Sequence, residues 1–185
     1  MSTSSTPLNI LIILGASRPD SQSAKVAHFI QQLLTDRSGV DPTLVAVSDF
    51  QLDFDGQASL PQFHQQLEQA DALLIVTPEY NHSFPGKLKT LLDTEFAVYK
   101  HKPVAIASVS SGQFGGVRAV EALTPVLTLF GMIVTGLNLH FPNIGQVFDE
   151  TGQPVERKTI ERSQVVIEDL IYLTKLVKAG QQAML

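Results

Sequence analysis

A carboxylate, an aromatic ring and an amide stand side by side in this sequence, as Glu79, Tyr80 and Asn81. They follow the apolar run Ala72–Thr77, and a helical pattern opens with a proline and a glycine soon after them. An ordinary turn explains the asparagine and the prolines, because these residues suit left-handed backbone and helix starts. It does not explain a ring and a carboxylate at the end of a buried strand. We expect a planar ligand here, with Tyr80 as one wall of its site.

A second polar segment, "GASRPDSQS", separates an apolar run from a helical pattern at Gly15–Ser23. A helix N-terminus offers unpaired backbone N–H groups and the positive end of a dipole, which together suit phosphate. Ser17, Ser21 and Ser23 add hydroxyl groups. Arg18 adds a guanidinium, which matches phosphate oxygens. The segment fits neither the Walker pattern nor the dinucleotide fingerprint. The alternative is that Ser21 or Ser23 caps the helix and Arg18 is solvated.

A third segment, "SSGQFGGVR" at Ser110–Arg118, also joins an apolar run to a helical pattern. Its glycines let the backbone approach a flat group closely, and the alternative is a mobile hinge. Together the three segments predict one site, with a phosphate pocket at one end and two clamps for a flat ligand at the other. Flavin mononucleotide (FMN) has that shape.

The elements that must position these segments follow from the hydrophobic pattern, in which short apolar runs alternate with helical spacing. The expected strands are Leu8–Leu14, Thr43–Val47, Ala72–Thr77, Val104–Val109 and Met132–Leu139, and the expected helices are Ser23–Leu34, Pro61–Ala70, Gly86–Phe96, Val117–Phe130 and Val155–Ala179. Pro125 is expected to kink or split the fourth helix. Such alternation predicts an α/β fold with a parallel sheet, in a flavodoxin-like or a Rossmann-type order. Ligands of these folds bind at the carboxyl ends of the strands.

Length and composition limit the classes of protein that remain. The 185 residues suit one domain, expected over residues 8–180 after a disordered lead-in at 1–7. A net charge of −5 argues against a nucleic-acid binder. There is no cysteine for a thiolate nucleophile or metal cluster. The five histidines show no metal spacing and are expected to have surface roles, with His82 as the exception to watch because it adjoins the turn at Tyr80 and Asn81. No apolar run is long enough for a membrane helix, so we expect a cytoplasmic protein without membrane partners.

The three segments resemble the NADPH-dependent FMN reductase family of flavodoxin-like proteins, over Leu8 to about Leu139. The matching residues are Gly15, Ser17, Arg18 and Ser21, then Pro78–Asn81, Ser83, Pro85, Gly86, Leu88, Lys89 and Asp93, and finally Ser110, Gly112, Gly115, Gly116 and Arg118. The resemblance implies a three-layer sandwich with a five-stranded parallel sheet in the order 2-1-3-4-5. The expected FMN-binding residues are Gly15, Ser17, Arg18, Ser21, Ser23, Pro78, Glu79, Tyr80, Asn81, Ser110, Ser111, Gly112, Gly115 and Gly116.

The same resemblance implies an activity. NADPH or NADH would pass a hydride to FMN, and electrons would go on to a small acceptor such as a flavin, a quinone, an azo compound or a metal oxyanion. No side chain is expected to be catalytic, because the flavin carries the chemistry. The resemblance also implies a homodimer or a dimer of dimers, with Lys87–Tyr99 as the expected interface.

One alternative stays open at this stage, a flavodoxin-type electron carrier that binds FMN without a nicotinamide site. Arg18 argues against it, since such carriers typically use a loop of serine, threonine and glycine. A receiver domain is excluded because no clustered aspartates follow the expected strands, which end at Leu14 and Thr77. A serine hydrolase is excluded because G-x-S-x-G is absent.

Overall fold

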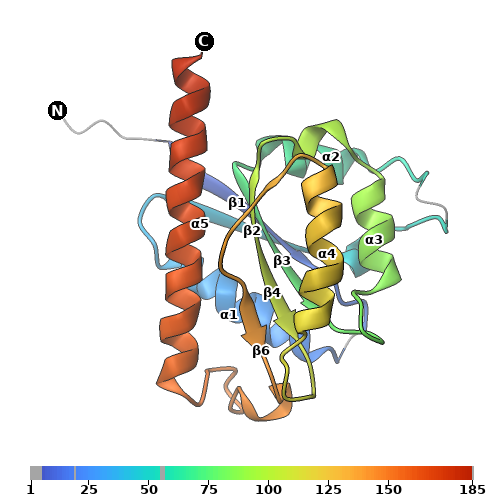
Figure 1. The fold of residues 1–185 in the computed structure, drawn as a ribbon, viewed down its shortest axis with the longest axis vertical. Helices are drawn as coiled ribbons and strands as arrows, with labels where there is room; N and C mark the ends of the chain where they lie inside the picture. Colours follow the sequence, from blue (N-terminus) through green and yellow to red (C-terminus); the bar gives the residue numbers. More distant parts are fainter. Residues whose placement is uncertain (1–5, 19, 55–56, 185) are drawn as a thin grey trace.

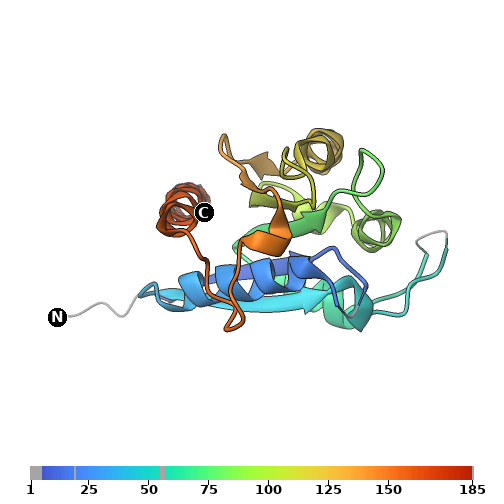
Figure 2. The same cartoon turned by 90° about the horizontal axis from the view of Figure 1, so that it is seen from below.

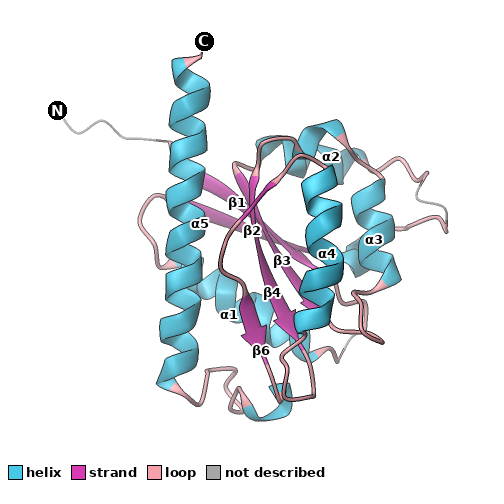
Figure 3. Cartoon of the chain, viewed as in Figure 1, coloured by secondary structure: helices cyan, strands magenta, loops and turns pink. Residues whose placement is uncertain are grey.

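The computed structural model describes residues 6–18, 20–54 and 57–184, and most of the expected lead-in lies outside these ranges. Figures 1 and 3 show a single twisted sheet with helices packed on both of its faces. The strands are β1 Leu8–Leu14, β2 Val40–Ala46, β3 Ala72–Pro78, β4 Pro103–Val109, β5 Ile133–Val134 and β6 Leu139–Phe141. The helices are α1 Gln22–Thr35, α2 Pro61–Gln69, α3 Gly86–Asp93, α4 Val117–Leu129 and α5 Arg157–Ala183. In the described part of the chain, no helix is both long enough and apolar enough to cross a membrane.

All strand pairs are parallel, and the order β2-β1-β3-β4-β5 confirms the expected topology. The additional strand β6 also pairs with β4, where Ala107 lies opposite Leu139. After β2 the chain crosses to the other side of β1, and the strand order reverses there. This reversal creates the switch point at which folds of this kind bind ligands.

Both faces of the sheet are apolar, which explains the uninterrupted hydrophobic runs in its central strands. Ile10 and Ile12 of β1 face α1 and α5, whereas Leu11 and Ile13 face the layer that holds α2, α3 and α4. Figure 2 shows these two helical layers on opposite sides of the sheet. All four of these side chains are at most 2% exposed, so apolar packing fills both faces of the sheet along β1.

The expected fifth strand, Met132–Leu139, is wrong as a single element. It is divided into β5 and β6, each pairing in parallel with a different part of β4. Between them the Thr135 hydroxyl donates a hydrogen bond to the Leu137 carbonyl at 2.9 Å, which closes a local turn. Gly136 and Asn138 favour such a break, because glycine and asparagine are poor strand residues.

Two helix predictions also need correction. Pro125 does not split α4, which is continuous through it. Pro125 has no backbone N–H to donate to the Glu121 carbonyl. Glu121 lies on the exposed side of the helix, where water can donate to this carbonyl instead. The third helix ends at Asp93 and not at Phe96, and a turn of 3-10 helix follows at Ala97–Tyr99.

The remaining boundaries differ from prediction by a few residues. The second strand begins earlier than expected, at Val40, and gives way after Ala46 to a short 3-10 helix. The final helix extends to Ala183.

Candidate functional site

The loops after β1, β3 and β4 meet at the carboxyl edge of the sheet, as the topology predicts. The Gly15 N–H donates to the Val76 carbonyl at 2.7 Å, which ties the first loop to β3. The Glu79 N–H donates to the Val109 carbonyl at 2.9 Å, which ties the second loop to β4. The three segments found in the sequence are therefore neighbours in space, at the edge that Figure 2 presents.

The second loop is a tight hairpin closed by two backbone hydrogen bonds between Tyr80 and Ser83, with N···O distances of 2.8 and 3.0 Å. Asn81 and His82 occupy its two central positions with φ values of 50° and 66°. The left-handed backbone expected at Asn81 is confirmed. The same conformation at His82 is uncommon for a residue with a side chain, and backbone strain of this kind concentrates at functional sites.

Glu79 links the second loop to the third. Its Oε2 atom accepts a hydrogen bond of 3.3 Å from the backbone N–H of Arg118, in the first turn of α4. A carboxylate at this position interacts favourably with the positive end of the helix dipole. Glu79 therefore has a structural task that needs no proton transfer.

Arg18 links the first loop to the second. Its guanidinium carbon lies 5.1 Å from the centre of the Tyr80 ring, within the range of a cation–π interaction. Arg18 is exposed, and Tyr80 is half-buried. A positive charge thus stands directly beside the aromatic wall that the sequence predicted.

The remaining first-loop residues divide by role. Ser21 caps α1 by accepting the Ser23 N–H at 3.2 Å, so the capping alternative is confirmed for Ser21. Ser23 is buried. A side chain on Gly15 would come within 2.8 Å of Leu88 on α3, so this glycine serves close packing. Ser17 is half-buried and Arg18 is exposed, and both shortly precede the N-terminus of α1.

The glycines of the third loop also divide by role. Gly115 and Gly116 have φ values of 64° and 84°, which favour glycine. A side chain on Gly116 would lie 2.9 Å from Ser108 Cβ. Gly112 has neither constraint, since its φ is not positive and open space surrounds the position a Cβ atom would take. Neither backbone conformation nor packing explains this glycine.

The third loop is held in place and is not the mobile hinge considered above. The Ser110 N–H donates to the Phe141 carbonyl, and the N–H groups of Asn143 and Ile144 donate to the carbonyls of Gly112 and Ser110, each at 3.1 Å. The Ser110 hydroxyl donates to the Gly112 carbonyl at 2.9 Å, while Ser111 is exposed. The segment after β6 therefore anchors the loop.

Two histidines make side-chain contacts while they remain accessible to solvent, as expected of surface residues. Nδ1 of His140, on β6, lies 2.8 Å from the hydroxyl oxygen of the buried Ser108. His64 pairs with Glu95 at 2.9 Å, and this hydrogen bond raises the pKa of the imidazole. Sequence reasoning missed Ser108 and His140 because their partners come from strands that meet only in the fold.

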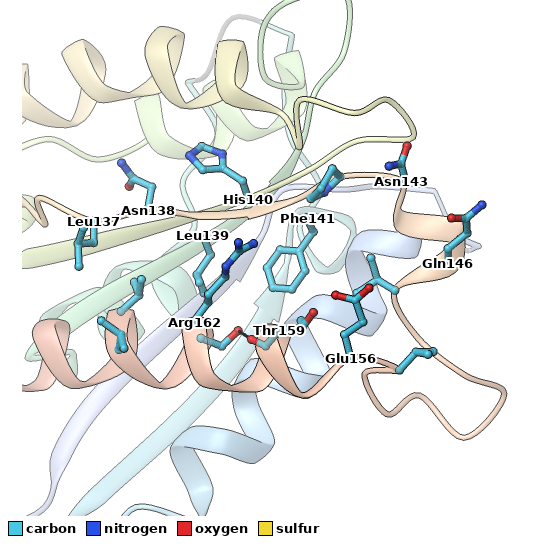
Figure 4. Close-up of a pocket in the computed structure, with 16 residues that line it drawn as sticks. Leu137, Asn138, Leu139, His140, Phe141, Asn143, Gln146, Glu156, Thr159 and Arg162 are labelled. Atoms are coloured by element: carbon cyan, nitrogen blue, oxygen red, sulfur yellow. Dashed lines mark hydrogen bonds between the residues drawn. The ribbon is translucent and has the colours of Figure 1, made fainter.

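A pocket of about 560 Å³ lies elsewhere, between α5 and the chain segment from Leu137 to Asn143. Figure 4 shows Phe141 and Arg162 extending into the space between β6 and α5. The predicted site residues all lie in the described part of the chain, and none of them lines this pocket. Its walls are mainly apolar, and among the described residues they include the start of α5, at Glu156 and Thr159, but none of the glycine loop Ser110–Arg118.

Comparison with known proteins shows the family to which the chain belongs. Residues 8–145 match the family described as NADPH-dependent FMN reductase. A quinone reductase of Pseudomonas putida is 28% identical over 92% of this chain and 97% of its own length. A 2-hydroxy-1,4-benzoquinone reductase of a Burkholderia species is 33% identical over 69% of this chain and 74% of its own.

Among solved structures, the fold resembles that of a flavoenzyme from Paracoccus denitrificans, FerB, described as an NAD(P)H:(acceptor) oxidoreductase. The two share a TM-score of 0.77 and 23% identity, over 91% of this chain and 98% of the other. The family match spans more than half of the chain, so the protein belongs to the NADPH-dependent FMN reductase family. It is an oxidoreductase of the flavodoxin-like class, with FMN as cofactor and a nicotinamide as electron donor.

The first prediction concerns Gly112. Replacing it with alanine should weaken FMN binding at least several-fold, because a methyl group would occupy the space in which the flavin meets the backbone. The thermal midpoint of the apo-protein should stay unchanged, since nothing lies within 4 Å of the added Cβ atom. Fluorescence titration of apo-protein with FMN measures the affinity. Gly136→Ala, at another open glycine, is the matched control, and equal affinity in both variants would contradict the assignment.

The second prediction concerns Arg18. A charge-assisted hydrogen bond to phosphate contributes roughly 1.5–3 kcal/mol, so Arg18→Ala should weaken FMN binding by about ten- to a hundredfold. Riboflavin lacks the phosphate, and its affinity should barely change. Lys25→Ala serves as control, because Lys25 is an exposed cation further along α1. A loss that is equal for FMN and riboflavin would show that Arg18 acts on the ring, through Tyr80, and not on the phosphate.

Proposed function

We propose that this protein is an NAD(P)H-dependent FMN reductase whose acceptor is a quinone, with residues 8–180 as one FMN-binding domain. The observation that carries the proposal is the meeting of three loops at one sheet edge, with a cation and a helix N-terminus at one end and an unexplained glycine at the other. The likeness to quinone reductases supports the choice of acceptor, because it extends over 92% of the chain.

The residues have distinct tasks in this proposal. Ser17, Arg18 and the N-terminus of α1 hold the phosphate of FMN. Tyr80 and Asn81 line one side of the isoalloxazine ring, and the backbone at Ser111 and Gly112 donates to its polar edge. When bound, FMN supplies the redox chemistry, taking a hydride from NAD(P)H and giving electrons to the acceptor. The protein orients the reactants and leaves one ring face open to a flat substrate.

An electron carrier with the same cofactor is the competing function. Such a carrier needs no nicotinamide site and would not turn over NAD(P)H in the steady state. The family match and the flavin and quinone reductases among its relatives favour the reductase.

The third prediction tests this function by kinetics. A single open face above the flavin should serve NAD(P)H and quinone in turn, so NAD(P)⁺ leaves before the quinone enters. Initial rates measured at several fixed quinone concentrations should give parallel double-reciprocal lines. Intersecting lines would indicate that both substrates bind together, and an absence of NAD(P)H oxidation would favour the carrier. Benzoquinone and free FMN, assayed side by side as acceptors, test the quinone preference.

The proposal includes a homo-oligomer in the cytoplasm, where NAD(P)H is available. Within the expected interface, Leu88, Leu91, Leu92 and Tyr99 are buried in the protomer and contribute to its own core. Phe96 is 60% exposed, and its ring meets that of Phe130 edge-on at 5.7 Å between centroids. Leu129, next to Phe130, is 73% exposed. Phe96 and Leu129 are thus exposed apolar side chains that a second copy would cover.

The fourth prediction is that Phe96→Asp converts the oligomer to a smaller species, because a carboxylate would be buried in the interface without a partner. Light scattering after size exclusion measures the mass. Tyr172→Asp is the control, since Tyr172 is equally exposed, at 61%, on α5. Dissociation by the Tyr172 variant alone would place the interface on α5 instead.

A further inference from the structure

Ser108 is the buried centre of a small hydrogen-bond cluster behind the third loop. It lies near the end of β4 with no exposed surface. Its hydroxyl oxygen is 2.7 Å from the Gly115 carbonyl oxygen, 2.8 Å from His140 Nδ1 and 3.3 Å from the Leu139 carbonyl oxygen. The cluster thus joins β4, β6 and the glycine loop through a single hydroxyl group.

Counting protons favours one direction for these bonds. The Ser108 hydroxyl has one hydrogen, and the Gly115 carbonyl is its nearest acceptor. We therefore assign the proton of the neutral imidazole to His140 Nδ1, which donates to the serine oxygen. The reverse arrangement, with Ser108 donating to Nδ1, would leave the Gly115 carbonyl without this donor. Partial burial lowers the pKa of the His140 imidazole, which favours the neutral form at pH 7.

The cluster holds the part of the loop whose backbone is most constrained. Gly115 and Gly116 both have positive φ, and a side chain on Gly115 would come within 2.9 Å of His140 Cβ. Gly115 therefore sits directly against His140, and its carbonyl direction depends on the Ser108 hydroxyl. Gly112, the position left open for the flavin, lies three residues earlier in the same loop.

We propose that His140 is a positioning residue for the cofactor, which acts by donating its Nδ1 proton to Ser108 and so fixing the Gly115 carbonyl and the shape of the Gly112–Gly116 loop. This inference rests on the proposed function, in which that loop receives the flavin. His140 also borders the pocket beside α5, but Figure 4 shows its imidazole on the side of β6 that faces away from the helix. Its ring therefore belongs to the loop and not to the pocket.

The fifth prediction tests the donor itself. His140→Asn can replace the Nδ1–H with an amide N–H, because the asparagine Nδ2 takes nearly the same place, whereas His140→Ala supplies no donor. His140→Ala should weaken FMN binding by about three- to tenfold, the range expected of one neutral hydrogen bond. His140→Asn should keep the affinity within about twofold of the parent. His28→Ala, an exposed histidine on α1, is the control.

Two measurements on the apo-protein do not involve the cofactor. The ¹⁵N shifts of the His140 ring should show a protonated Nδ1 and an unprotonated Nε2 at pH 7. Amide hydrogen exchange at Gly115 and Gly116 should quicken in His140→Ala and stay slow in His140→Asn. If the parent fails to bind FMN, the proposed function fails, and these measurements still decide the positioning role. A proton on Nε2, or equal behaviour of the alanine and asparagine variants, overturns it.

Discussion

Burial on both faces of the parallel sheet is the constraint on which the rest of this protein depends. Apolar side chains fill the space between the sheet and its two helical layers, so polar groups can gather only where strands end. Because every strand runs the same way, the loops after β1, β3 and β4 emerge at one edge. The switch point between β1 and β3 separates the outgoing connections, and folds of this kind bind ligands there. The location of the proposed site thus follows from the topology.

At that edge the loops are held by contacts between one another. Arg18 lies over Tyr80, and Glu79 binds the first turn of α4 through the Arg118 N–H. The hairpin at Asn81 and the glycine loop both use left-handed backbone, which their neighbours must maintain. A site made of such mutual contacts is largely formed before its ligand arrives, and binding then costs less conformational entropy. This arrangement suits a cofactor that the protein must orient, but whose reaction needs no catalytic side chain.

Sequence patterns predicted the alternation of strands and helices and the three loops, because hydrophobic period and turn chemistry are local properties. The strand order itself was implied by the family resemblance. Asn81 was recognised as a turn residue because asparagine tolerates left-handed backbone. The break at Gly136 was missed, because the apolar residues around it were read as one strand. The turn there is closed by a hydrogen bond from the Thr135 hydroxyl to the Leu137 carbonyl. The roles of Gly15 and Ser108 could not be predicted from the sequence either. Gly15 meets Leu88, and Ser108 meets His140, across distances in sequence that only the packed fold closes.

The central claim is that FMN binds at the loops of the carboxyl edge, with its phosphate at the start of α1. Titrating FMN into ¹⁵N-labelled apo-protein and following backbone amide shifts tests it directly. The largest shifts should fall on Ser17, Arg18 and Gln22 for the phosphate, and on Asn81 and Gly112 for the ring. Amides at 159–166 of α5, which line the separate pocket, should stay unchanged. Shifts concentrated on that helix, with the three loops unaffected, would contradict the account.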